Sequence, residues 1–172
     1  MKDNYRIYKN LAERNNWDFS IGEDTKPYFM KDDNLAIPDE FTSEDDKLLL
    51  ASIISEGSEE LLKLILNCWE NNIEISGPCS GIKEFHTKEP VIMQFGISST
   101  PDIVLSLYEE LAQIMPDSYH LVKIEDGKIK YNFNHLLREN ILTEDESNQV
   151  FRIIDDRLNY ILRMQKNKQL TK

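Results

Sequence analysis

Apolar positions recur with the spacing of an α-helix in two consecutive segments of the chain. Residues 42–57 have an apolar face around Leu48, and the segment that starts at Ser58 carries a wide apolar stripe that ends at Trp69. Acidic residues crowd the first turn of each segment, where the helix dipole favours anions. The pattern predicts two helices, and the width of the second stripe predicts that this helix is buried on more than one side.

Further helices are predicted at both ends of the chain and in its middle. Residues 3–16 carry apolar side chains at helical spacing, and Pro101 opens a helix over 101–115. A capping box at 143–146 opens a long helix with a continuous apolar face. A short helix over 134–140 is predicted to precede it.

Alternating or β-branched runs predict four strands. Residues 73–76 alternate, residues 91–97 are apolar and β-branched, and the run 119–133 divides into two alternating halves around an Asp-Gly pair. That pair suits the positive backbone angles of a tight hairpin turn. Between the first two strands, the sequence GPCSG at 77–81 has the composition of a sharp turn.

From Ser58 onward, the predicted order is helix, strand, strand, helix, strand, strand, helix. This order favours an α+β fold with two layers, in which about four mostly antiparallel strands carry helices on one face. Residues 1–42 are predicted to form an N-terminal helix followed by an irregular or partly stranded arm, and residues 43–172 to form the α+β domain.

The charge balance restricts the classes of partner. The chain has 31 acidic and 20 basic residues, which gives a net charge of -11. Such a charge repels nucleic acid at long range and favours basic protein surfaces, so we expect no direct binding to duplex DNA.

The sequence predicts a protein that stays in the cytoplasm of the cell that makes it. The apolar runs 48–54 and 61–69 are far shorter than the ~20 residues that span a bilayer, so no membrane segment is expected. The first ten residues, MKDNYRIYKN, lack the apolar region of a secretory signal peptide. The chain has two cysteines, which we expect to be reduced thiols.

Cys79 and His86 form the sharpest catalytic hypothesis. Cys79 lies between Gly77 and Gly81, where small neighbours leave a thiol accessible, and His86 follows seven residues later as a candidate base. The alternative is a structural turn around a small, half-buried cysteine. Spacing alone leaves both interpretations open, because catalysis also needs an orienting group and an oxyanion site.

Paired carboxylates are candidates for binding. Glu109 with Glu110 and Asp155 with Asp156 stand in predicted helices, where adjacent side chains point about 100° apart and rarely converge on one ion. A solvated helix face that attracts a basic partner is therefore favoured over a metal site. The cysteines and histidines lack the paired spacing of zinc ligands, so neither a metal nor a cofactor is predicted.

Aromatic residues in the N-terminal arm are the second set of binding candidates. Trp17, Phe19, Tyr28 and Phe29 lie in an irregular acidic segment, where they could anchor a partner protein. The alternative is that they attach the arm to its own domain.

The segment LLKLILNCWENNIEISGPCSG resembles small proteins of phages and mobile elements in low-GC Gram-positive bacteria. The matching positions are Cys68, Trp69, Asn71, Ile73, Cys79 and Gly81. A histidine often follows the glycine in those proteins, whereas this chain has Ile82. Some of them are anti-CRISPR inhibitors, so the resemblance implies a bacterial host cell and, as the partner, an RNA-guided nuclease such as Cas9 with its guide RNA.

Two functional hypotheses follow. The first is an inhibitor or interaction protein without catalytic activity, which binds a basic protein or ribonucleoprotein through an acidic surface. The second is a small hydrolase or nuclease that acts through Cys79 and His86 or through a metal.

Overall fold

The structure is a computed structural model that describes residues 2–22, 26–32, 34–79, 91–125, 127–137 and 144–170. The chain forms two compact units, an N-terminal unit (Met1–Leu50) and a C-terminal unit (Ala51–Lys172). The domain boundary predicted from the sequence lies between residues 42 and 43, whereas the two units divide between Leu50 and Ala51, within a helix.

The N-terminal unit contains helix α1 and a small antiparallel sheet. Its elements are α1 (Lys2–Asn15), β1 (Asp18–Ile21), β2 (Pro27–Lys31), β3 (Asn34–Leu35) and the first part of α2 (Glu44–Ile54). The strand order is β1-β2-β3, so much of the arm predicted to be irregular or partly stranded is paired as a sheet. The helix predicted over 3–16 corresponds to α1.

Aromatic rings fill the space between α1 and this sheet. The ring of Phe29 stacks on that of Phe19 with centroids 5.5 Å apart, and it contacts Trp17 and Tyr8 edge-on at 6.2 and 6.3 Å. Such ring pairs add stabilisation beyond the area they bury. The core of this unit is therefore small, and it combines these rings with the buried aliphatic residues Leu11, Ala12, Ala36 and Leu50.

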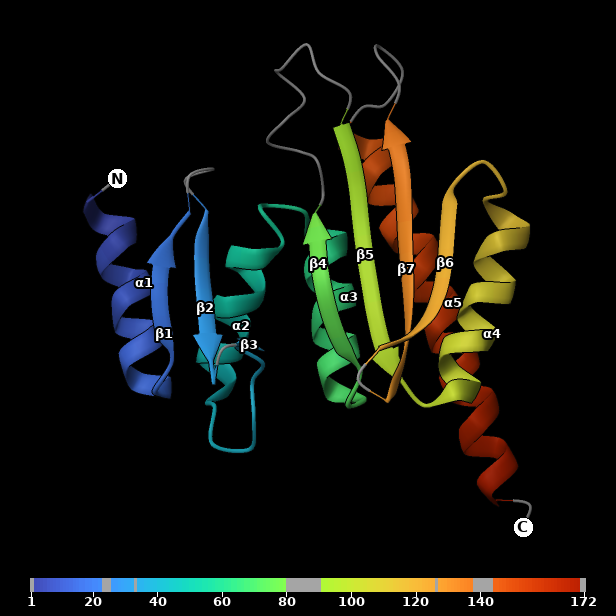
Figure 1. The fold of residues 1–172 in the computed structure, drawn as a ribbon, viewed down its shortest axis with the longest axis horizontal. Coiled ribbons are helices and arrows are strands. Elements are labelled where there is room, and N and C mark those ends of the chain that lie inside the picture. The colour runs from blue at the N-terminus through green and yellow to red at the C-terminus, as the bar shows by residue number, and fades with distance from the viewer. Residues whose placement is uncertain are drawn as a thin grey trace. The chain divides into compact units, whose positions relative to one another are not determined.

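The C-terminal unit is the predicted two-layer α+β domain. Its elements are α3 (Glu59–Glu70), β4 (Glu74–Cys79), β5 (Val91–Ser99), α4 (Pro101–Ile114), β6 (Tyr119–Glu125), β7 (Lys128–Leu137) and α5 (Glu144–Leu170), as Figure 1 shows. The strand order is β4-β5-β7-β6, and every pairing is antiparallel. The element order from Ser58 is the predicted one, and the fold class is confirmed.

One face of this sheet packs against α3, α4 and α5. Apolar side chains that alternate along the strands, among them Phe95, Ile97, Tyr131 and Phe133, form one buried cluster with residues of all three helices. The opposite face carries polar side chains around Gly96. A Cβ atom at Gly96 would collide with Ser76 Oγ and lie 3.0 Å from the Ser76 carbonyl oxygen, so this position has no room for a side chain.

Local signals located several of these elements correctly. Ser58 caps α3 because its Oγ accepts a hydrogen bond from the backbone N–H of Leu61. The β6–β7 hairpin turns between Glu125 and Lys128, and Gly127 in this turn has a φ of 73°, a left-handed conformation that glycine adopts without strain.

Two local predictions were wrong. The segment predicted as a helix over 134–140 continues β7 to Leu137, because β5 pairs with it as far as Val91. The turn predicted over 77–81 is wrong for 77–79, which belong to β4 after a register shift at Ser76, while residues 80 and 81 lie outside the described residues. A bulge on an edge strand accommodates Pro78, which has no N–H to donate to a neighbouring strand.

Candidate binding surface

The N-terminal ends of α3 and α5 lie side by side. The two helices run parallel, because their contacts follow the same order along both: Ser58 with Asn148, then Glu60 with Arg152. Ser58 Oγ donates a hydrogen bond of 2.8 Å to Asn148 Oδ1 while it also caps α3. Two positive helix-dipole ends therefore meet at one side of the C-terminal unit.

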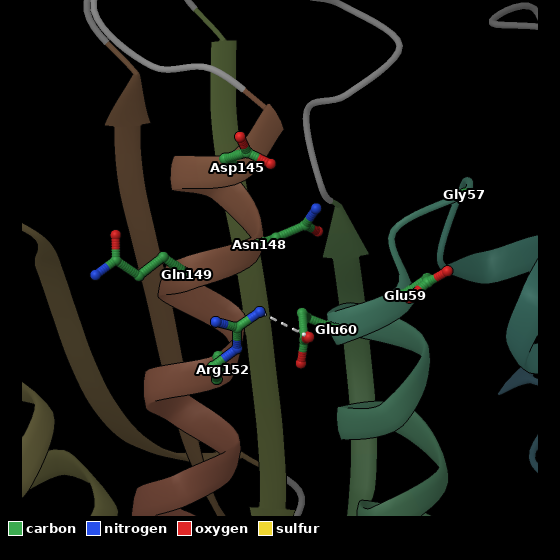
Figure 2. Close-up of a pocket in the computed structure, with 7 residues that line it drawn as sticks. All are labelled: Gly57, Glu59, Glu60, Asp145, Asn148, Gln149 and Arg152. Carbon is green, nitrogen blue, oxygen red and sulfur yellow. Dashed lines mark hydrogen bonds and ion pairs between the residues drawn. The ribbon is translucent and has the colours of Figure 1, made fainter.

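A polar pocket opens between these two helix ends (Figure 2). Its volume is about 470 Å³, and its lining is Gly57, Glu59, Glu60, Asp145, Asn148, Gln149 and Arg152. The lining offers carboxylates, amides and one guanidinium. The pocket is therefore suited to ionic and hydrogen-bonded contacts with a polar partner.

Glu60 organises the charges at this pocket. Its carboxylate accepts hydrogen bonds from Arg152 at 3.0 Å and from Lys63 at 3.1 Å. The bond from Arg152 is the main reason that the pKa of Glu60 is lowered. Glu59 and Asp145 are exposed, so the negative charge that a partner meets comes mostly from these two residues.

The predicted carboxylate pairs do not converge. Glu109 and Asp156 are exposed, whereas Glu110 forms an ion pair of 3.7 Å with Arg157. Asp155 is half-buried and accepts a hydrogen bond from Asn67 of α3. It therefore does not share the exposed face of Asp156, with which it was predicted to attract a basic partner. Across the described ranges, no group of three or more His, Cys, Asp or Glu side chains is placed to hold a metal ion.

Asp155 belongs to a network of amides between α3 and α5. Its carboxylate accepts hydrogen bonds from Asn67 at 2.7 Å and from Asn159 at 3.1 Å, and Asn71 donates to Asn67. Burial is the main cause that raises the pKa of Asp155. These contacts fix the alignment of α3 with α5, although Asn67 and Asp155 are 88 positions apart in the sequence.

The predicted aromatic anchors divide into two groups. Trp17 and Phe29 are buried in the N-terminal unit, and Phe19 stacks on Phe29. Tyr28 is 39% exposed and is the member of the set most accessible to a partner. For the buried members, the geometry favours attachment of the arm to its own unit.

The catalytic hypothesis falls largely outside the described residues. Cys79 ends β4 with its backbone paired to Gln94, while His86 lies in the range 80–90. Cys68 is a free, fully buried cysteine, and burial together with the charge of Asp155 raises the pKa of its thiol. Cys68 therefore stays protonated and is a core residue.

His120 has a structural role within the C-terminal unit. Its Nε2 lies 2.8 Å from the carbonyl oxygen of Met115, which can only accept, so Nε2 carries the proton. Its Nδ1 lies 2.7 Å from the hydroxyl oxygen of Tyr131, within hydrogen-bond distance. Both ring nitrogens are thus engaged in linking β6 to the end of α4 and to β7.

Sequence reasoning missed the residues that shape the polar pocket. Arg152 contacts Glu60, which lies 92 positions earlier in the sequence, and Asn148 contacts Ser58, which lies 90 positions earlier. It also missed Phe41, an aromatic side chain that is 87% exposed. The local signal for Phe41 was available, because Asp39 and Thr42 are residues that commonly build a turn.

Comparisons with protein-family models, curated proteins and solved structures give no match to this chain. Among the parts of the chain that the structure describes, no helix has the length and apolar character needed to cross a membrane.

Proposed function

We propose that the protein is an inhibitor or interaction protein without catalytic activity, which binds a basic protein or ribonucleoprotein. The partner that the sequence resemblance suggests is an RNA-guided nuclease loaded with its guide RNA, and the setting is the cytoplasm of a bacterial host. Such nucleases carry positively charged channels for nucleic acid, which an acidic protein can occupy or cover.

The observation that supports this proposal is the distribution of charge on the helical layer. Three of its cations already lie against carboxylates, since Lys63 and Arg152 both bind Glu60, and Arg157 pairs with Glu110. Among the described side chains of the three helices, the exposed carboxylates are Glu59, Glu70, Asp102, Glu109, Asp145 and Asp156. Helices α3, α4 and α5 together carry eleven acidic and six basic residues, and this excess of negative charge attracts a basic surface and accelerates the encounter.

The test measures binding to a guide-loaded nuclease and inhibition of its DNA cleavage at several salt concentrations. We expect the affinity to fall as salt rises, because exposed charges are screened. A variant with Glu59→Gln, Glu109→Gln, Asp145→Asn and Asp156→Asn should bind several-fold more weakly than the unmodified protein, mainly through a slower association rate.

A matched variant controls for the number of substitutions. Arg163→Gln, Lys166→Gln and Lys168→Gln change exposed residues near the end of α5 and make the protein more acidic, so binding should be retained or strengthened. Equal binding by both variants, or binding that is indifferent to salt, would contradict the proposal. Cys79→Ala should leave inhibition intact, and its loss in a folded variant would favour the thiol enzyme instead.

A further inference from the structure

Asp39 and Thr42 build a compact turn in the N-terminal unit. The backbone N–H of Asp39 donates to Thr42 Oγ1 at 3.1 Å, and the backbone N–H of Thr42 donates to the Asp39 carbonyl oxygen at 3.1 Å. Asp39 Oδ1 accepts a hydrogen bond of 3.0 Å from the Phe41 N–H, and Asp39 Oδ2 accepts one of 2.8 Å from Lys31. The turn is therefore closed by its own backbone and side-chain hydrogen bonds, and the ion pair of Asp39 with Lys31 links it to strand β2.

This turn holds the side chain of Phe41 in solvent. Phe41 is 87% exposed, whereas the next residue, Thr42, is 5% exposed. Leaving a phenyl ring in water is unfavourable, and a disordered loop could fold the ring back against its own unit. Here the hydrogen bonds of Asp39 and Thr42 fix the backbone on either side of Phe41. Because this backbone is already ordered, little of its conformational entropy is lost when the ring binds a partner.

Acidic residues surround Phe41 in the sequence. Glu40 precedes it, and Glu44 and Asp45 begin α2 directly after the turn, all three with exposed side chains. The complementary surface is an apolar pocket bordered by lysine or arginine. An aromatic side chain in such a pocket is the usual form of a binding hot spot.

We infer that Phe41 is a preformed anchor that inserts into an apolar pocket with a basic rim on a partner protein. The inference rests on the proposed function and names the contact through which that partner is held. Neither the buried aromatics Trp17 and Phe29 nor the polar pocket between α3 and α5 provides such a contact.

The direct test replaces Phe41 with the photo-crosslinking analogue p-benzoylphenylalanine in the full-length protein inside bacterial cells. The analogue keeps the aromatic ring, and the same substitution at Ile124, which is 79% exposed, is the matched control. We expect light-dependent adducts at position 41 but not at position 124, mapped by mass spectrometry to an apolar site next to lysine or arginine. Adducts with Ala51–Lys172 of the same chain, with a second copy, or with no protein would overturn the inference.

Affinity measurements separate this inference from the proposed function. With the guide-loaded nuclease as the probe, Phe41→Ala should weaken binding about tenfold or more, while Asp39→Ala should weaken it less by loosening the turn. The urea midpoint of Phe41→Ala should match that of the unmodified protein, because the ring is exposed. Unchanged affinity in Phe41→Ala would refute the anchor and leave the proposed function standing, whereas a nuclease that the unmodified protein does not bind would refute the choice of partner.

Discussion

Asp46 in the N-terminal unit and Asp155 in the C-terminal unit occupy similar settings, but their pKa values shift in opposite directions. Each lies on a helix, and each accepts hydrogen bonds from asparagine side chains, Asp46 from Asn15 and Asp155 from Asn67 and Asn159. The hydrogen bond from Arg14 is the main reason that the pKa of Asp46 is lowered. Burial is the main reason that the pKa of Asp155 is raised.

The difference shows that amides alone do not compensate for burying a carboxylate. Asparagine donors satisfy the oxygens of Asp155, but they bring no positive charge to replace the lost hydration. Arg14 supplies that charge to Asp46 through two of its nitrogens. The N-terminal unit thus uses an ion pair to join α1 to α2, whereas the C-terminal unit relies on its apolar core and uses the Asp155 network for register.

The largest expected effect tests this reliance on the apolar core. Phe151 on α5 is fully buried, and Phe151→Ala should lower the free energy of unfolding by about 3–5 kcal/mol through lost burial and a cavity. Urea unfolding of the whole protein, followed by circular dichroism and by hydrogen exchange in α5, measures it. Met164→Ala changes a 44% exposed side chain of the same helix and should have little effect. A small loss for Phe151→Ala would mean that the core does not dominate this unit.

A smaller effect is expected for the ion pair of the N-terminal unit. Asp46→Asn should destabilise the packing of α1 on α2 by about 1–2 kcal/mol, because Arg14 loses its charged acceptor; the loss is limited since Arg14 is half-exposed. Hydrogen exchange of the α1 amides reports this loss. Asp45→Asn removes the same charge from an exposed neighbour and is the control. If both variants behave alike, helix-dipole effects rather than the pairing with Arg14 explain the change.

The same ion pair gives the N-terminal unit a defined response to acid. Because the folded-state pKa of Asp46 lies below its unfolded value of about 3.9, the stabilisation is fully present above that value. It is lost as the pH falls through the lowered folded-state pKa. Protection of the α1 amides should therefore decrease in that range in the unmodified protein, and the decrease should be weaker in Asp46→Asn.

Local chemistry predicted the fold better than it predicted the contacts between helices. Ser58 as a cap and Pro101 as a first helical residue act within one turn of chain, so the sequence alone was sufficient to locate α3 and α4. The segment 134–140 was misjudged because pairing with β5 overrides local helix preference.

The candidate sites show the same division. The contact of Asn67 with Asp155 depends on how two helices pack, and Asp155 was therefore assigned with Asp156 to a solvated face. No spacing within α5 indicates which of two adjacent aspartates turns toward α3. By contrast, the turn that displays Phe41 is built within four residues, Asp39 to Thr42, so a closer reading of turn residues could have found it.

The smallest effect on stability is expected for Asp155→Asn. The direction in which this effect changes with pH is the sharpest test of the difference between Asp46 and Asp155. At neutral pH the variant should differ from the unmodified protein by less than about 1 kcal/mol, because relief from burying a charge offsets the acceptor that one amide loses. The folded-state pKa of Asp155 lies above its unfolded value of about 3.9, so the folded protein takes up the proton first as the pH falls.

Between those two pKa values, protonation of Asp155 should therefore stabilise the C-terminal unit, while the N-terminal unit keeps the stabilisation from Asp46 until the pH is lower. The Asp155→Asn variant should lack this gain, which hydrogen exchange of the α3 and α5 amides can detect against the same amides in the unmodified protein. If Asp155 instead lost stabilisation on acidification as Asp46 does, a positive charge would have to reach it, and the distinction between the two aspartates would fail.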